Sequence, residues 1–346
     1  MRKTLRHMTA TVAVGALALA MGACSSDKPA AEGNAGATDG ASAPAEVMEV
    51  KFGYIPDLNG TSLLAIAEGE GLWEKHGLKA NLQTFTNGPL QIQAMGTEDI
   101  DYGYIGNGAF WLPASGKADM ACLLATSQAD RLIAQPGIKS IADLKGKKVG
   151  VPEGTSGDTI LTLALEKNGM TVDDINRVPM DPATVVSAFS AGQIDAAGIW
   201  YPLVGTIKEQ VPDLEEIAQD SDFEDTMAFP SAIVMRKGLA EKDAELAKRV
   251  QKVLYEALNY RAENPDKTLE LVAKMSQQKV EDLKGEAEHI KVLSAEDQIK
   301  LWDDGTIKKW LENMNKFFVK GGKVQESEVL SPDEYFKADL LKEAAK

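Results

Sequence analysis

The chain has few of the residues that build common catalytic centres. Its 346 residues include three histidines and two cysteines. Apart from His7 near the start, the histidines are His76 and His289, both on segments that read as exposed helices. A histidine-based catalytic triad or a histidine-rich metal site therefore lacks its parts. We expect no metal site, no cofactor and no catalytic residue, and we treat an enzyme as the weaker interpretation.

Phosphate-binding and nucleic-acid-binding signals are also lacking. No G-x-x-x-x-G-K-[S/T] phosphate loop occurs, and the run from Gly106 to Gly108 begins like a dinucleotide fingerprint but has Trp111 in place of the third glycine. Acidic residues outnumber basic ones by 52 to 37, which gives a formal net charge of -15. Because binding to nucleic acid needs basic patches, this balance argues against a nucleic-acid partner.

The N-terminus carries the clearest local pattern. Arg2, Lys3 and Arg6 precede an apolar run over residues 9–20, and small residues follow. This order is typical of a secretory signal peptide, and the apolar run is too short to cross a bilayer core of roughly 30 Å. Residues 21–24 resemble a bacterial lipobox, with Cys24 as the acylated residue. We predict a lipoprotein signal peptide over 1–23; the alternative is an ordinary signal peptide with a chance cysteine.

The segment 24–46 reads as a lipidated cysteine followed by a flexible tether. Residues 25–46 contain no aromatic or branched aliphatic side chain, so they cannot bury enough apolar surface to offset their ordering entropy. The pattern predicts an extracytoplasmic protein that touches the membrane only through its lipid. With Cys24 acylated, Cys122 has no disulfide partner and reads as a small buried hydrophobe.

From residue 47 the sequence alternates between strands, polar loops and helices. The expected strands cover residues 47–55, 78–85, 100–105, 118–126, 148–151, 175–180, 194–199 and 232–235. This rhythm predicts an α/β fold with mostly parallel sheets, in which the polar loops gather at the carboxyl ends of the strands. Residues 130–135 and 232–237 read as two crossings between lobes. We predict lobe 1 over 47–132 plus 234–346 and lobe 2 over 133–233.

The order and spacing of several motifs resemble one family of binding proteins. Residues 87–89, 141–151, 154–156, 192–196 and 200–202 are similar to periplasmic binding proteins for aliphatic sulfonates, taurine and nitrate. The same family includes binders of thiamine-related pyrimidines. The resemblance implies a type II periplasmic-binding-protein fold: two lobes, each a mostly parallel sheet flanked by helices, joined by a hinge of two crossing strands. It also implies a monomer that closes on its ligand and delivers it to an ABC transporter permease.

The polar loops supply the candidate site. They contain no lysine or arginine, so an oxyanion would rely on hydroxyl groups and on the free N–H groups of helix N-termini. The same loops are acidic, and a carboxylate there can either cap a helix or pair with an ammonium group. The predicted ligand-binding residues are Asp57, Asn59, Thr61, Ser62, Asn87, Gly88, Asn107, Gly108, Thr126, Thr155, Ser156, Gly157, Asp158, Asp181, Trp200, Tyr201 and Phe229.

Two of these residues, Trp200 and Tyr201, can form an aromatic wall that packs a carbon stem or faces a cation. We therefore predict a solute-binding lipoprotein of an ABC importer that binds an aliphatic sulfonate such as taurine. The alternatives are a binder of a thiamine-related pyrimidine or another small heterocycle, an enzyme on the same fold, and a structural surface lipoprotein. The acidic loops, which lack arginine, favour a zwitterion or a cationic or neutral heterocycle over nitrate.

Overall fold

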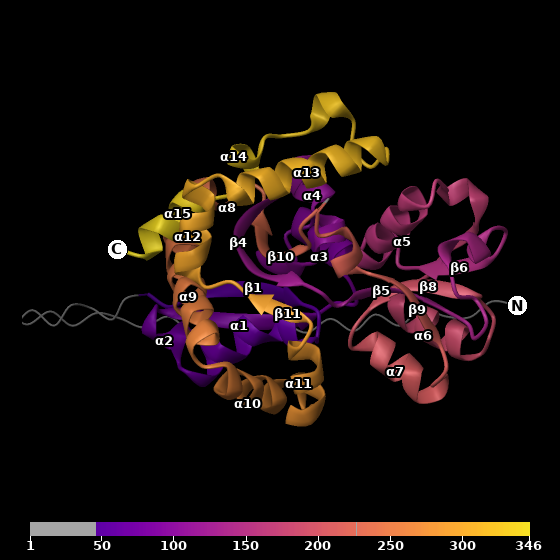
Figure 1. The fold of residues 1–346 in the computed structure, drawn as a ribbon. Coiled ribbons are helices and arrows are strands. Elements are labelled where there is room, and N and C mark those ends of the chain that lie inside the picture. The colour runs from indigo at the N-terminus through magenta and orange to yellow at the C-terminus, as the bar shows by residue number, and fades with distance from the viewer. Residues whose placement is uncertain (1–45, 226) are drawn as a thin grey trace, which may run out of the picture. The chain divides into compact units, whose positions relative to one another are not determined.

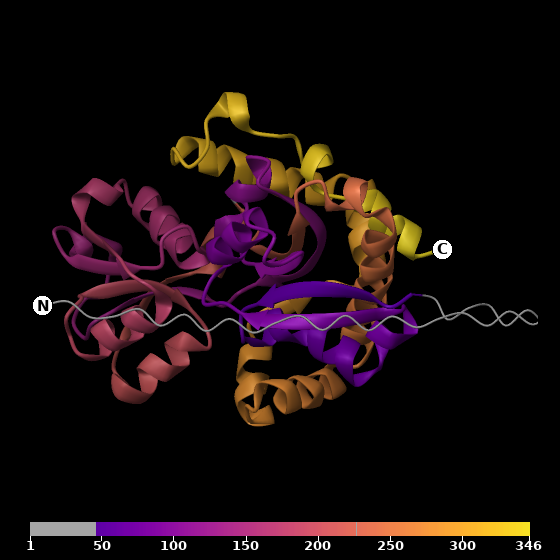
Figure 2. The same ribbon diagram turned by 180° about the vertical axis from the view of Figure 1, so that it is seen from behind.

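A computed structural model describes residues 46–225 and 227–346 of the chain. The predicted signal peptide, Cys24 and the tether up to residue 45 lie outside the described residues. Within the described part, no helix is both long enough and apolar enough to span a membrane. Figures 1 and 2 show the ribbon from two opposite sides.

The described chain builds two β-sheets. The first has the strand order β11-β4-β10-β3-β1-β2 and the second β7-β6-β8-β5-β9. In both views the helices α5, α6 and α7 gather around the second sheet, at the end of the molecule opposite the C-terminus (Figures 1 and 2). The strands are β1 Met48–Tyr54, β2 Leu78–Thr84, β3 Tyr102–Ile105, β4 Ala118–Ser127, β5 Asp130–Ala134, β6 Lys148–Val151, β7 Asn176–Pro179, β8 Ala196–Trp200, β9 Glu215–Gln219, β10 Pro230–Arg236 and β11 Ile290–Val292.

Helices cover both faces of the first sheet and flank the second. The α-helices are α1 Leu58–Gly69, α2 Leu72–Lys75, α3 Gly88–Gly96, α4 Trp111–Ala114, α5 Ser156–Lys167, α6 Pro182–Ser190, α7 Leu203–Gln210, α8 Leu239–Lys242, α9 Ala244–Glu263, α10 Pro265–Ser276, α11 Val280–Ala287, α12 Ala295–Asp303, α13 Thr306–Lys320, α14 Pro332–Tyr335 and α15 Ala338–Ala344. Short 3-10 turns are η1 Asn107–Ala109, η2 Ile141–Leu144, η3 Val172–Asp174, η4 Asp220–Phe223 and η5 Glu326–Glu328.

The sheets are mixed, whereas the sequence rhythm predicted mostly parallel ones. In the first sheet β1 runs parallel to β2 and β3, but β10 is antiparallel to both β3 and β4. In the second sheet β6 is parallel to β7 and β8, while β5 is antiparallel to β8 and β9. A parallel neighbour requires a crossover connection. The strands β4, β5 and β10 are antiparallel to each neighbour that they pair with.

The two passages between the sheets lie outside the segments expected to cross. Strand β5 pairs along its length within the second sheet, and β10 pairs within the first. The chain changes sheet at residues 128–129 and 220–229 instead, so residues 130–132 and 230–233 belong to the opposite sheet from the one predicted. Both strands are buried almost throughout and have a partner on each side, as central strands do. The apolar pattern therefore marked sheet centres and not crossings.

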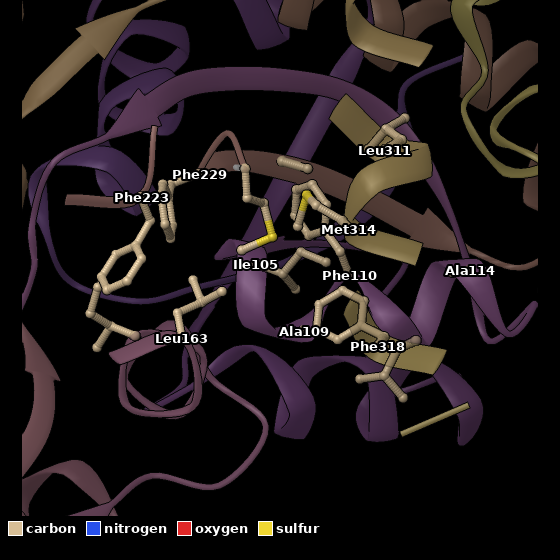
Figure 3. Close-up of a cluster of buried hydrophobic side chains, with 14 of the residues drawn as sticks. Ile105, Ala109, Phe110, Ala114, Leu163, Phe223, Phe229, Leu311, Met314 and Phe318 are labelled. Carbon is tan, nitrogen blue, oxygen red and sulfur yellow. The ribbon is translucent and has the colours of Figure 1, made fainter. Parts of the chain in front are cut away.

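Alternate residues of the central strands point to two different cores. In β3 the Tyr104 side chain packs in the cluster that includes α1 and α9, whereas Ile105 packs in the cluster that includes α13. Figure 3 shows the second cluster, in which Phe110, Leu163 and Phe318 come together from η1 and its flank, α5 and α13. This apolar cluster takes residues from both sheets. Cys122 is buried in the first cluster, as expected.

Helix α1 begins ahead of Thr61 and Ser62, two residue types that often cap helices. Asp57 caps α1 by accepting a hydrogen bond from the Gly60 N–H, so Thr61 and Ser62 lie inside the helix and not at its cap. Asn87 caps α3, and Asp181 caps α6. The Asp57 carboxylate is a better cap than the Thr61 hydroxyl could offer because aspartate is favoured over threonine at the N-cap position.

Candidate functional site

A cavity of about 60 Å³ lies between the two sheets, which we call the inter-sheet cavity. It is lined by loops that follow β1, β2 and β3, by the N-terminus of α5 and by the carboxyl end of β8, with β10 and α11 closing it. Nine of the predicted residues line it: Asp57, Asn59, Asn87, Gly88, Asn107, Thr155, Ser156, Trp200 and Tyr201. The polar loops therefore converge, as expected for loops at the carboxyl ends of strands.

Several other predicted residues serve the fold beside the cavity. Thr61 and Ser62 are fully buried in α1, where the Ser62 hydroxyl donates to the Asn59 carbonyl (3.1 Å). Gly157 has no room for a side chain because a β-carbon would lie 2.4 Å from the Gly198 carbonyl oxygen. Gly108 packs against the backbone of Thr155 and lines a neighbouring cavity.

The remaining predicted residues point elsewhere. Asp158 is buried in an ion pair with Arg177 (2.9 Å), and the exposed Asp181 caps α6 by accepting from the Thr184 N–H (3.0 Å). Thr126 lies within β4, where it pairs with β10 and β11. Phe229 is 2% exposed and packs in the apolar cluster of Figure 3. For Asp158 and Asp181 the structure supports the capping or pairing role over contact with a ligand.

The cavity also contains groups that the sequence pattern missed. Tyr104, Asp130, Ser231 and Glu286 all line it. Asp130 begins β5 and was read as part of a crossing strand. Glu286 lies on α11, more than two hundred residues after the loop that it meets, and only the tertiary fold brings it there. Its one sequence signal is an acidic residue on the apolar face of an amphipathic helix.

Asp57 and Glu286 both bind the N-terminal turn of α1. The Gly60 N–H donates to Asp57 Oδ1 (2.7 Å), and the Leu58 N–H donates to Glu286 Oε2 (2.9 Å). Burial raises the pKa of Asp57 to about 7, although its backbone hydrogen bonds oppose that shift. Burial, together with the nearby charge of Asp57, raises the pKa of Glu286 to about 7. Both carboxyl groups thus titrate near neutral pH.

A second acidic pair lies at the start of β5. Asp220 Oδ2 accepts a hydrogen bond from the Asp130 N–H (3.0 Å). Burial raises the pKa of Asp130 to about 6, while Ser156 and Asn107 beside its carboxylate favour the charged form. Burial and the charge of Asp130 hold the pKa of Asp220 well above its usual range. The cavity wall thus has three carboxyl groups, with a fourth behind it.

The nearby arginines are committed to other partners. Arg131 Nε donates to Glu216 (2.6 Å), and its Nη1 donates to the Asp130 carbonyl (2.8 Å). Arg236 pairs with Asp101 and Glu98. Arg261 lies behind the wall, where Nη2 donates to Asn59 Oδ1 (2.7 Å), and burial lowers its pKa to about 10. No lysine, arginine or histidine is found among the described residues that line the cavity.

Three polar atoms of the lining residues are buried and make no hydrogen bond to the described part of the chain. They are Asn107 Oδ1, Asp130 Oδ1 and Ser231 Oγ. The amide oxygen of Asn107 can only accept a hydrogen bond, the carboxyl oxygen of Asp130 accepts when the group is charged, and the Ser231 hydroxyl can accept one. Because a buried acceptor without a partner costs about 1–3 kcal/mol, these atoms favour a ligand that donates hydrogen bonds.

The two residues of the predicted aromatic wall, Trp200 and Tyr201, make different contacts. Trp200 is 9% exposed and lines the cavity. Tyr201 stacks on His289 with ring centroids 4.4 Å apart, and Arg131 lies 5.3 Å from the tyrosine ring. The Tyr201 hydroxyl donates to Glu216 (3.0 Å). Tyr201 therefore ties the end of β8 to the segment before β11, which leaves Trp200 as the freer apolar surface.

Two helix N-termini reach the wall, those of α3 at Gly88 and α5 at Ser156. Asn87 caps α3, but the Thr155 side chain does not cap α5 and instead donates to the Pro152 carbonyl (2.6 Å). Uncapped N–H groups at a helix start attract a negative group. The site thus combines an acidic wall with one helix start that suits an oxyanion.

Known proteins resemble the chain over most of its length. A family model described as NMT1/THI5 like matches residues 61–268. A Brucella abortus (strain 2308) protein named only as a binding protein is 50% identical over 86% of this chain and 92% of its own length. The taurine-binding periplasmic protein of Escherichia coli (strain K12) is 25% identical over 58% of this chain and 63% of its own.

Solved structures share the fold at low sequence identity. The periplasmic aliphatic sulphonate binding protein SsuA of Escherichia coli has a TM-score of 0.64 at 22% identity, covering 85% of this chain and 99% of that one. The desulfurization enzyme DSZB has a TM-score of 0.61 at 15% identity, covering 86% and 98%. The fold therefore occurs in binding proteins and in an enzyme, while the relatives in sequence are named as binding proteins. The predicted family and fold are confirmed: this chain belongs to the NMT1/THI5-like family and has the two-lobed fold of the periplasmic binding proteins.

Proposed function

We propose that the protein is the extracytoplasmic substrate-binding component of an ABC importer and that it captures a small ligand with a protonated nitrogen. The observation that carries this proposal is the acceptor-rich wall of the inter-sheet cavity. Asp57, Asp130 and Glu286 line it without a basic residue, and Asn107 Oδ1 and Asp130 Oδ1 have no protein donor in the described chain. An ammonium or amino group supplies donors and positive charge together.

The raised pKa values of these carboxyl groups fit such a ligand. In the free protein, burial favours the neutral acids, and an arriving cation favours their charged forms. A bare inorganic anion would instead add negative charge beside three acids, which is unfavourable at a buried site.

An aminoalkanesulfonate such as taurine fits both halves of the site. Its ammonium group would contact the carboxylates, and its sulfonate would lie at the N-terminus of α5, beside Thr155 and Ser156. The relatives that bind taurine and aliphatic sulfonates support this choice. The second candidate is an amino-substituted heterocycle such as a thiamine-related pyrimidine, favoured by the flat face of Trp200 at the cavity wall.

Matched pairs of ligands test the proposal. Calorimetric titrations should compare taurine with ethanesulfonate, and 4-aminopyrimidine with 4-hydroxypyrimidine, with nitrate as an anion control. Because a hydrogen bond to a charged group is worth about 1.5–3 kcal/mol, we expect the member of a pair that carries the amino group to bind at least about tenfold more tightly. Equal or tighter binding of ethanesulfonate would contradict the proposal.

We also propose that the protein binds its ligand without catalysing a reaction on it. The ligand should be recovered unchanged, by mass, after long incubation with the protein. We further propose that it acts as a monomer, anchored through Cys24, and that it docks on an ABC transporter permease. The two sheets, with the changes of sheet at 128–129 and 220–229, would form the lobes that close around the ligand.

A further inference from the structure

An apolar groove adjoins the inter-sheet cavity. It has a volume of about 200 Å³ and lies between the segments that follow β1 and β2 and those that begin α6 and α7. The groove and the cavity share three lining residues, Ile55, Asp57 and Trp200. These shared residues place the groove directly beside the cavity.

The residues that line the cavity and the groove differ in polarity on the two sides of Asp57. On the cavity side the wall also carries Asp130 and Glu286. On the groove side Asp57 and Thr86 are the polar residues among the described lining, and the rest are apolar, including Phe85, Pro182 and Leu203. A charged group placed in the groove would have one possible partner, Asp57, at its inner end. The groove therefore suits a part of a ligand that has no charge and few polar atoms.

The size of the groove matches a short chain or a single ring. An engineered protein cavity of roughly 150 Å³ holds one benzene molecule. Phe85 and Leu203 are partly exposed, so their apolar surface is available to a ligand. Burial of each methylene group on such a surface is worth about 0.8 kcal/mol.

We infer that the ligand is an amphipathic amine, whose protonated nitrogen lies at Asp57 and in the acidic cavity and whose alkyl chain or ring fills the apolar groove. The nitrogen half of this inference rests on the proposed function; the apolar half rests on the groove. It narrows the substrate class to amines that carry an apolar body larger than the two carbons of taurine.

A homologous ligand series tests the inference. The affinities of n-alkylamines from propylamine to hexylamine should be measured by calorimetry, each beside the n-alkanol of the same length. We expect the affinity of the amines to rise about fourfold with each methylene group. Two variants alter the groove: Ala183→Phe fills it from an exposed position, and Leu203→Ser makes its lining polar. In both, hexylamine should lose most of this gain in affinity, while the affinity for propylamine should stay unchanged.

Leu90→Ser is the matched control because Leu90 is an exposed leucine near a helix start that lines neither space. It should bind the series like the native protein. An affinity that stays flat from propylamine to hexylamine, or a gain that persists in both groove variants, would overturn the inference while leaving the acidic site intact. If no amine binds more tightly than its alkanol, the proposed function itself fails.

Discussion

Gly108, just after β3 of the first sheet, lies directly against Thr155 at the start of α5 of the second. A β-carbon at Gly108 would stand 2.0 Å from both the carbonyl carbon and the carbonyl oxygen of Thr155. Carbon atoms in van der Waals contact lie about 3.5–4.0 Å apart, so no side chain fits there while the sheets keep this arrangement. The contact makes Gly108 a steric requirement of this arrangement of the two sheets.

Gly108→Ala should therefore weaken ligand binding more than it weakens folding. The added methyl group separates the loop from α5, and the apparent affinity falls with the fraction of molecules that can close. We expect a loss of at least about tenfold in affinity, with a larger radius of gyration at saturating ligand by solution scattering. Gly96→Ala is the control because a β-carbon there would meet nothing within 4 Å and Gly96 lines neither the cavity nor the groove. A native affinity in Gly108→Ala would refute the steric role.

Asp57→Asn should separate the charge of this residue from its role as a helix cap. Asparagine caps helices about as well as aspartate, so the stability of α1 should change little. The ligand, however, loses a charged partner, and its affinity should fall by about tenfold to a hundredfold in calorimetry. Asp181→Asn removes the same cap charge from α6, at an exposed site outside the cavity, and should leave binding unchanged. Equal effects of the two substitutions would exclude a ligand contact at Asp57.

The raised pKa values of Asp57 and Glu286 predict a stability that falls as the pH rises. Their usual values are 3.8 and 4.5, and in the folded protein both lie at about 7. Between these limits the folded state holds protons that the unfolded state has released, so the free energy of unfolding decreases with rising pH. The loss should occur between about pH 4.5 and pH 7 in urea titrations of the ligand-free protein.

The double variant Asp57→Asn, Glu286→Gln should remove this component of the pH dependence. For a cationic ligand the affinity should change in the opposite direction and increase over the same range, because the carboxylates become charged. A native-like slope in the double variant would show that other groups cause the effect.

Sequence reasoning succeeded where local chemistry decides the structure. Local sequence marks the starts of α3 and α6: Asn87 stands ahead of Pro89 and Asp181 ahead of Pro182, and a polar cap followed by proline suits a first helical turn. The apolar alternation likewise located most strands within a residue or two. The missing lysine and arginine in the loops also predicted the cavity wall, since no other described segment places a basic side chain in its lining.

The rest of the site depends on tertiary structure. Glu286 meets α1 only because α11 packs beside it, and no local pattern encodes that meeting. Asp130 was read as part of a crossing, although its strand is central in the second sheet. Phe229 was predicted to bind the ligand, but it lies at the end of the second passage between the sheets and packs into the shared core. A phenylalanine can line a ligand site or fill a core, and only the tertiary packing decides which of the two it does.

Cys24→Ser should release the protein from the membrane. The expected lipobox makes Cys24 the acylated residue, and the tether that follows supplies no other attachment. Metabolic labelling with a radioactive fatty acid should mark the native protein and not the variant, which should move to the soluble extracytoplasmic fraction. An ordinary signal peptide would give neither labelling nor any change in fractionation.

The most direct test of the acidic site is a crystal structure of the protein bound to the tightest nitrogen-bearing ligand of the titrations. We predict that a ligand nitrogen lies within hydrogen-bond distance of Asp130 Oδ1 or Asn107 Oδ1, with Asp57 or Glu286 beside it. A ligand whose only polar contacts were oxyanion contacts at the start of α5, with its nitrogen turned away from all three carboxylates, would contradict it.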